Sequence, residues 1–150
     1  MLKKIFTLIL FLILTSCGYE AIHSIKNSNN YNFSISELTF EGQRNVNLKI
    51  KEKLNNFTLV EKDKNFILKI SSVSEKVVLA KDISGDPTSF KSTVTVNVEV
   101  VNKNNFKVIE DFTYNNIENK FDLKKYEREI INNLAETATD KLIFKLSNIR

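Results

Sequence analysis

The sequence is short of the residues that usually carry covalent links, metal ions and phosphate groups. Its 150 residues include one cysteine, one histidine, one proline, three glycines and no tryptophan. A single cysteine excludes an internal disulfide. One cysteine and one histidine are also too few ligands for a zinc site built from thiolates and imidazoles. Three isolated glycines exclude a glycine-rich phosphate loop. Hydrophobic packing must therefore hold the fold together.

The sequence also has no large excess of positive or negative charge. Lysine and arginine number 22 and aspartate and glutamate 18. Loss of residues 1–16, which include two lysines, would leave 20 basic against 18 acidic residues, a net charge of +2. The three arginines, Arg44, Arg128 and Arg150, are far apart in sequence. Nucleic-acid binding needs a concentrated basic face, so we expect no nucleic-acid partner.

Residues suited to catalysis are scarce as well. An active site needs a nucleophile, a base and stabilising donors that converge. The single histidine, His23, lies in a polar stretch near the N-terminus, and Asp82 and Asp86 share one loop without further candidate metal ligands. We interpret the two aspartates as turn formers. We therefore expect no enzymatic activity, no metal and no bound cofactor.

The N-terminus, in contrast, has a clear pattern. Lys3 and Lys4 precede an apolar run from Ile5 to Leu14, and small residues follow up to Cys17. The run has about half of the roughly twenty apolar residues that a membrane-spanning helix needs, which is typical of a secretory signal. We therefore predict a signal peptide over residues 1–16.

Cys17 is the expected point of attachment to a membrane. The sequence Leu-Thr-Ser-Cys resembles the bacterial lipobox, in which the thiol takes a diacylglycerol, the chain is cut before the cysteine and the new amine is acylated. Two or three acyl chains hold a protein durably on a bilayer, whereas one holds it reversibly. The alternative is an ordinary thiol in an uncleaved signal anchor. Acylation accounts better for a single unpaired cysteine in an exported protein.

The remaining chain is long enough for one domain. Residues 17–32 are polar and rich in asparagine and predict a tether, and residues 33–150 carry the periodic patterns of a folded domain. Residues 33–40 predict a first strand with a bulge near Glu37. A short helix is expected next, with Asn45 as its N-cap and its end near Asn55.

Three further strands and a long helix are expected after that. Residues 66–79 predict a second strand, and a hairpin loop over 81–89 holds the only proline. Alternating valines over 94–100 predict a strand with one wet face, and a fourth strand follows over 106–117. Asp122 is expected to cap a final helix of about 25 residues, with Phe121 and Tyr126 as a hydrophobic staple.

This order predicts an α+β two-layer fold, with a four-stranded antiparallel or mixed sheet and both helices on one face. The other face carries polar side chains, and we expect it to be either solvated or covered by a partner. These polar residues are Thr93, Thr95, Asn97 and Glu99.

These features together resemble the lipopolysaccharide-assembly lipoprotein LptE family. The resemblance rests on the start from Leu14 to Tyr19, the order of strands and helices, the size, a proline-bearing loop at Asp86-Pro87 and a closing helix near 135–146. It implies a plug inside the outer-membrane β-barrel protein LptD, which it helps to fold and with which it delivers lipopolysaccharide to the outer leaflet. Some members bind lipopolysaccharide. Gly18 after the cysteine agrees with sorting to the outer membrane.

The hairpin loop is the first candidate for contact with the partner, and an ordinary exposed loop is the competing interpretation. Its candidate residues are Asp82, Gly85, Asp86 and Pro87. The candidates for contact with lipopolysaccharide phosphates are lysines near strand ends, which otherwise serve solvation: Lys81, Lys91, Lys103 and Lys107. A different function with the same anchor is an accessory subunit of another envelope machine, such as a transporter component or an activator of a cell-wall synthase.

Overall fold

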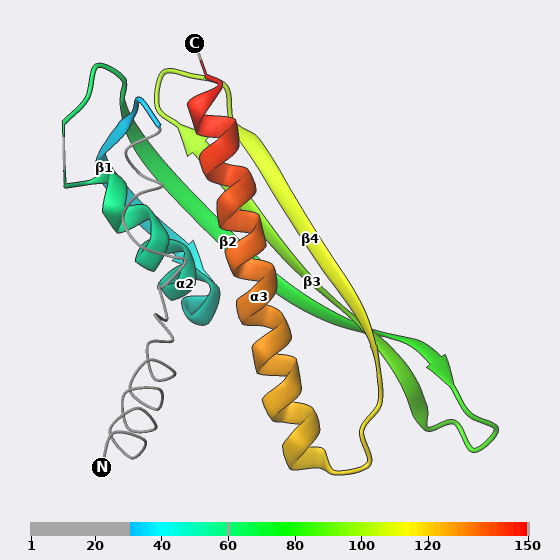
Figure 1. Cartoon of the computed structure of the whole chain (residues 1–150). Coiled ribbons are helices and arrows are strands. Elements are labelled where there is room, and N and C mark those ends of the chain that lie inside the picture. The colour runs from blue at the N-terminus through cyan, green and yellow to red at the C-terminus, as the bar shows by residue number, and fades with distance from the viewer. Residues whose placement is uncertain (1–30, 60, 150) are drawn as a thin grey trace, which may run out of the picture.

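The computed structural model describes residues 31–59 and 61–149, and these fold as a mixed sheet covered on one side by helices. The elements, in chain order, are β1 (Ser34–Gly42), α2 (Arg44–Leu54), the short 3-10 helix η2 (Asn55–Phe57), β2 (Asn65–Lys81), β3 (Pro87–Val100), β4 (Phe106–Asn115) and α3 (Lys120–Ser147). Both helices lie on the same face of the sheet (Figure 1). The predicted α+β fold and its element order are confirmed.

The sheet has the strand order β1-β2-β3-β4, which follows the chain. β1 pairs with β2 in parallel, whereas β2 with β3 and β3 with β4 are antiparallel. A parallel neighbour requires a crossover connection, and α2 supplies it. The β1 register shifts between Ile35 and Glu37, so the bulge expected near Glu37 is present.

The core lies between the sheet and the two helices. The valines at 94, 96, 98 and 100 are all buried, at most 1% exposed, and they alternate with more exposed polar residues. α3 contributes eight buried residues: Ile130, Leu134, Ala135, Ala138, Thr139, Leu142, Ile143 and Leu146. Their spacing of three and four residues places them on one side of the helix, which faces the valines of the sheet.

The two helices run in the same direction and are joined by ion pairs. Lys53 Nζ lies 2.8 Å from Asp140 Oδ1, and Lys49 Nζ lies 3.9 Å from Glu136 Oε1. The two lysines are four residues apart on α2 and the two acidic residues are four apart on α3, so each lysine lies opposite one acidic residue. These contacts tie the N-terminal half of the domain to its last helix.

Both helix starts differ from the predicted ones. α2 is preceded by Gln43, which makes no side-chain cap hydrogen bond, so Asn45 is not the N-cap. α3 is capped by Asn119, whose side chain accepts from the backbone N–H groups of Phe121 and Asp122. Phe121 is 75% exposed, which also excludes the expected staple. Asn119 lies three residues before Asp122 and already accepts from the free backbone N–H groups of the first helical turn, so Asp122 is not the cap.

An aromatic cluster closes the end of the domain where the described chain begins. Phe33 and Phe57 stack with ring centroids 4.7 Å apart, and Tyr31 lies 6.0 Å from Phe57. Lys64 Nζ donates to the Ile149 carbonyl at 3.2 Å at the same end. Tyr31 thus packs on the domain, although the sequence assigned it to the tether. Within the described residues, no helix combines the length and apolarity needed to cross a membrane.

Candidate functional site: the hairpin arm and the open sheet face

The β2-β3 hairpin extends well past the part of the sheet that β1 covers. The last pair between β1 and β2 is Gly42 with Ser72, so β2 residues 73–81 pair with β3 alone. At about 3.3 Å per residue, the 17 residues of β2 span about 56 Å. Figure 1 shows this hairpin projecting beyond the helices, far from the C-terminus. We call residues 73–92 the hairpin arm.

The loop at the tip of the arm is held by Asp82. Its side-chain Oδ1 accepts from the backbone N–H groups of Ser84 and Asp86, each at 2.9 Å. The backbone N–H of Asp82 donates to the Asp86 carbonyl at 2.9 Å, and Gly85 adopts a φ of +88°. Asp82 is thus a turn former, as interpreted from sequence. The observed loop is shorter than the predicted one over residues 81–89, because β2 continues to Lys81 and β3 begins at Pro87.

This internally hydrogen-bonded loop presents one apolar side chain to solvent. Ile83 has a relative exposure of 107%, and Val77, Val78 and Leu79 along the arm are about half exposed. Exposed aliphatic residues gathered on one projecting element are characteristic of interaction surfaces. The sequence analysis chose the polar turn residues of this loop and missed Ile83, whose apolar character between Asp82 and Ser84 was the available signal.

A polar network attaches the base of the arm to α3. Lys76 on β2 and Glu127 on α3 form a close ion pair. Glu127 also accepts from the Tyr114 hydroxyl at 3.2 Å, and Tyr114 lies 3.2 Å from the Ser92 hydroxyl. Burial raises the pKa of the Tyr114 phenol, and the charge of Glu127 acts in the same direction, whereas the Ser92 hydrogen bond lowers it. The network fixes the direction of the arm relative to the helix.

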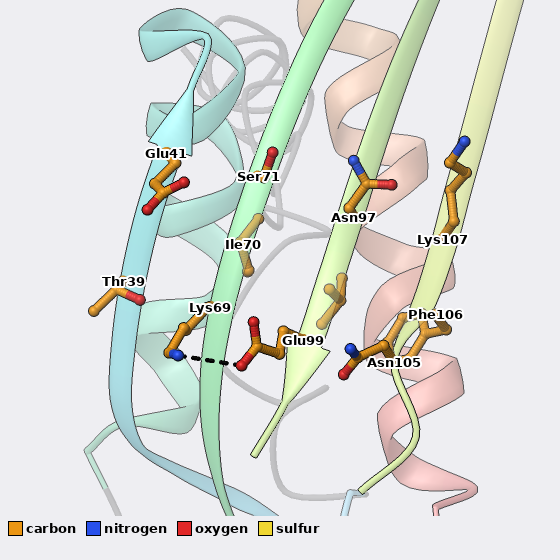
Figure 2. Close-up of a pocket in the computed structure, with 11 residues that line it drawn as sticks. Thr39, Glu41, Lys69, Ile70, Ser71, Asn97, Glu99, Asn105, Phe106 and Lys107 are labelled. Atoms are coloured by element: carbon orange, nitrogen blue, oxygen red, sulfur yellow. Dashed lines mark hydrogen bonds and ion pairs between the residues drawn. The ribbon is translucent and has the colours of Figure 1, made fainter.

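The sheet face opposite the helices is uncovered in the described structure and is hollowed near its centre. Figure 2 shows this hollow with the helices behind the sheet. Its volume is about 490 Å³, and its lining includes Thr39 and Glu41 from β1, Lys69 and Ser71 from β2, Asn97 and Glu99 from β3, and Asn105, Phe106 and Lys107 around the start of β4. The polar outer face predicted from β3 is therefore present.

The charges around the hollow balance. Lys69 Nζ lies 3.1 Å from Glu99 Oε1, while Glu41 and Lys107 supply one further charge of each sign. A phosphate site needs an excess of positive charge with donors that converge. This hollow therefore suits a polar, nearly neutral surface better than a phosphorylated ligand.

The four candidate lysines lie in two separate places. Lys81 and Lys91 belong to the hairpin arm, and Lys91 forms an ion pair with Asp111 at 3.2 Å. Lys103 lies in the β3-β4 turn, and Lys107 pairs with Asn97 on the open face. Asn97 is six residues from Lys91 along β3, or about 20 Å. In the described part of the chain, the four lysines do not form one phosphate-binding cluster.

Other predicted site residues are accounted for as follows. Cys17 and His23 lie outside the described residues. In residues 31–59 and 61–149, no three His, Cys, Asp or Glu residues gather closely enough to hold a metal ion. The Lys76–Glu127 pair was not predicted, because 51 residues separate its members and several lysines and glutamates are available for each role.

The fold resembles those of solved bacterial lipoproteins. Rare lipoprotein B from Shewanella oneidensis is 17% identical, with a TM-score of 0.57, and the match covers 74% of this chain and 93% of that one. An uncharacterized lipoprotein B from Nitrosomonas europaea is 11% identical, with a TM-score of 0.53 over 87% and 90% of the two chains. A minor lipoprotein from Acinetobacter baumannii is 13% identical, with a TM-score of 0.50 over 78% and 91%.

Sequence comparison adds no family assignment. No family model and no curated protein matches the sequence. At these identities the structural likeness speaks for the fold, and the chain has the fold of these lipoproteins.

Proposed function

We propose that this chain is a lipid-anchored lipoprotein of the outer membrane, and that its domain fills the lumen of a β-barrel partner, LptD, in lipopolysaccharide transport. The proposal combines the lipobox-like sequence before Cys17 with a domain whose fold is that of known lipoproteins. The proposed role is non-catalytic. The lipid on Cys17 attaches the protein to the membrane, and the folded domain provides the contact with the partner.

The observation that carries the proposal is the charge-balanced face of the sheet that residues 31–59 and 61–149 leave uncovered. The interior of a transmembrane barrel is polar, and a plug inside it must avoid burying unpaired charges. On this face Lys69 is paired with Glu99 and Lys91 with Asp111. Such a face can lie against a polar wall with these four charges already compensated.

The hairpin arm supplies the proposed point of specific contact. Its loop is internally hydrogen-bonded through Asp82, so Ile83 is held in place before a partner binds. A preorganised loop loses little conformational entropy on binding. In this proposal Asp82 and Gly85 shape the loop, Ile83 makes the apolar contact, and Lys81 and Asp86 flank it.

The test is cross-linking in intact cells, followed by purification of the full chain and mass spectrometry of its partners. Recovery of an outer-membrane barrel protein is the expected result. Ile83→Asp should lower that recovery several-fold, whereas Leu59→Asp, a matched change at an exposed leucine outside the arm, should not. Recovery of a cell-wall synthase or an inner-membrane transporter instead would refute the barrel assignment and favour the accessory-subunit alternative.

A further inference from the structure

The outer edge of β2 along the hairpin arm has no neighbouring strand in the described structure. β1 stops opposite Ser72, and each residue from Glu75 to Lys81 is exposed. An open edge presents a row of unpaired backbone donors and acceptors, which is a template for pairing with another chain. This edge is distinct from the loop and from the open sheet face described above.

The hydrogen bonds near Ser72 identify which residues face outward along this edge. The Ser72 carbonyl accepts from the Gln43 backbone N–H at 2.9 Å, and the Ser74 N–H donates to the Gln43 side chain at 3.3 Å. Since alternate residues of a strand point their backbone groups to the same side, Lys76 and Val78 also face outward. Their N–H and C=O groups are the free positions of the edge.

The stretch of edge that is open to pairing is short. The Gln43 side chain already accepts from the Ser74 N–H, and the register with β3 shifts between Val78 and Ala80, where an irregularity of the β-bulge type protects the edge. Between these limits Lys76 turns its side chain to the helix side, where it pairs with Glu127 and lies 3.8 Å from the Phe90 ring centroid. The open stretch is therefore Lys76 to Val78.

We propose that this edge binds a second copy of the same chain, as an antiparallel pair of β2 strands centred on Val77. Centring on Val77 places Lys76 of each copy opposite Val78 of the other, which pairs the outward-facing residues. Val77 then meets Val77 of the second copy, an apolar contact, and no like charges face each other directly. The reversed direction also brings Glu75 of one copy toward the end that carries Lys81 in the other.

This register makes a specific geometric prediction for disulfide cross-linking. Directly opposed residues in a non-hydrogen-bonded antiparallel pair have Cα atoms about 4.5 Å apart, which lies within the range that a disulfide bridges. In the same register, the two Ile83 residues are separated by a strand length of about 40 Å. Val77→Cys should therefore form a covalent dimer on mild oxidation of the full chain, and Ile83→Cys should not.

The experiment compares both cysteine variants with the wild-type chain, whose only cysteine is Cys17. Non-reducing electrophoresis should show several-fold more dimer for Val77→Cys than for Ile83→Cys or wild type. Equal cross-linking of the two variants, or none for Val77→Cys, would overturn the proposal.

A second pair of variants measures association without cross-linking. Sedimentation of the purified full chain in density-matched detergent should show a dimer that forms with rising protein concentration. Val77→Lys places two ammonium groups at the two-fold axis and should weaken the dimer several-fold, while Ile83→Lys should leave it unchanged. A monomer at every concentration, or equal effects of the two lysines, would refute pairing through this edge. Neither result depends on the barrel partner, so the proposed function is tested separately.

Discussion

Replacing Gly42 by alanine should destabilise the domain far more than the same change at Gly85. Both glycines have a φ of +88°, so both substitutions carry the same backbone penalty of about 1–2 kcal/mol for the left-handed region. The surroundings differ. An added Cβ at Gly85 meets no atom within 4 Å, whereas at Gly42 it would lie 2.1 Å from the Ser72 carbonyl oxygen.

That overlap can be relieved only if the end of β1 moves away from β2. The movement would break the hydrogen bond from the Gln43 N–H to the Ser72 carbonyl, now 2.9 Å long, and would strain the bond from the Ser74 N–H to the Gln43 side chain. Each such bond contributes about 0.5–1.5 kcal/mol net. With the backbone penalty, Gly42→Ala should cost about 3 kcal/mol.

Urea unfolding of both variants, followed by circular dichroism, measures the difference. We expect a fall in the free energy of unfolding of about 1–2 kcal/mol for Gly85→Ala and about twice that for Gly42→Ala, with m-values unchanged. Gly85 is the matched control because it shares the φ angle and lacks the clash. If the two substitutions cost the same, the close approach of Gly42 to β2 does not constrain the junction of β1 and α2.

Three other predictions test different parts of the molecule. Since burial raises the pKa of Tyr114, folding keeps its phenol protonated, and this stability should be lost as pH rises above about 10. Tyr114→Phe should therefore flatten the alkaline fall in the free energy of unfolding, and an unchanged slope would count against this origin. Leu142→Ala, at a fully buried position, should cost about 2–5 kcal/mol in urea unfolding. Phe144→Ala, two residues away and 63% exposed, should cost less than about 0.5 kcal/mol. Cys17→Ala should leave an uncleaved or mislocalised precursor by intact mass and membrane fractionation, and full processing of that variant would contradict the lipobox interpretation.

Elements whose burial repeats along the sequence were predictable. The alternation over Val94 to Val100 identifies β3 and its buried face, because a strand places successive side chains on opposite sides. The four-residue steps from Ile130 to Leu142 identify the buried side of α3 in the same way. Both patterns lie within one element, so they could be recognised without knowing which elements pack against it.

Helix starts were not predictable from residue type alone. Asn45 and Asp122 are good caps by composition, yet Gln43 and Asn119 occupy the cap positions. At α2 the chain leaves β1 immediately after Gly42, and the backbone of Gln43 is bonded to Ser72 on β2. The path of the strand thus sets the first helical residue, and capping propensity is too small an effect to move it.

The candidate site was predictable only in its location. Turn-forming residues marked the loop over 82–86, but its exposed apolar residue is Ile83, while the Asp82 carboxylate is hydrogen-bonded within the loop. The charge balance of the open face could not be derived, since Lys69 and Glu99 are 30 residues apart and meet only through the register of β2 with β3.

The contact between α2 and α3 also determines when the domain can be completed. β2, β3 and β4 form consecutive hairpins whose contacts are close in sequence, whereas α2 relies on α3, as the 87 residues between Lys53 and Asp140 illustrate. Contacts between distant segments form slowly and only after both segments have been synthesised. A nascent chain that ends before Lys120 has no α3, so the sides of the sheet and of α2 that α3 covers stay exposed. The domain therefore cannot reach its native state before α3 has been synthesised.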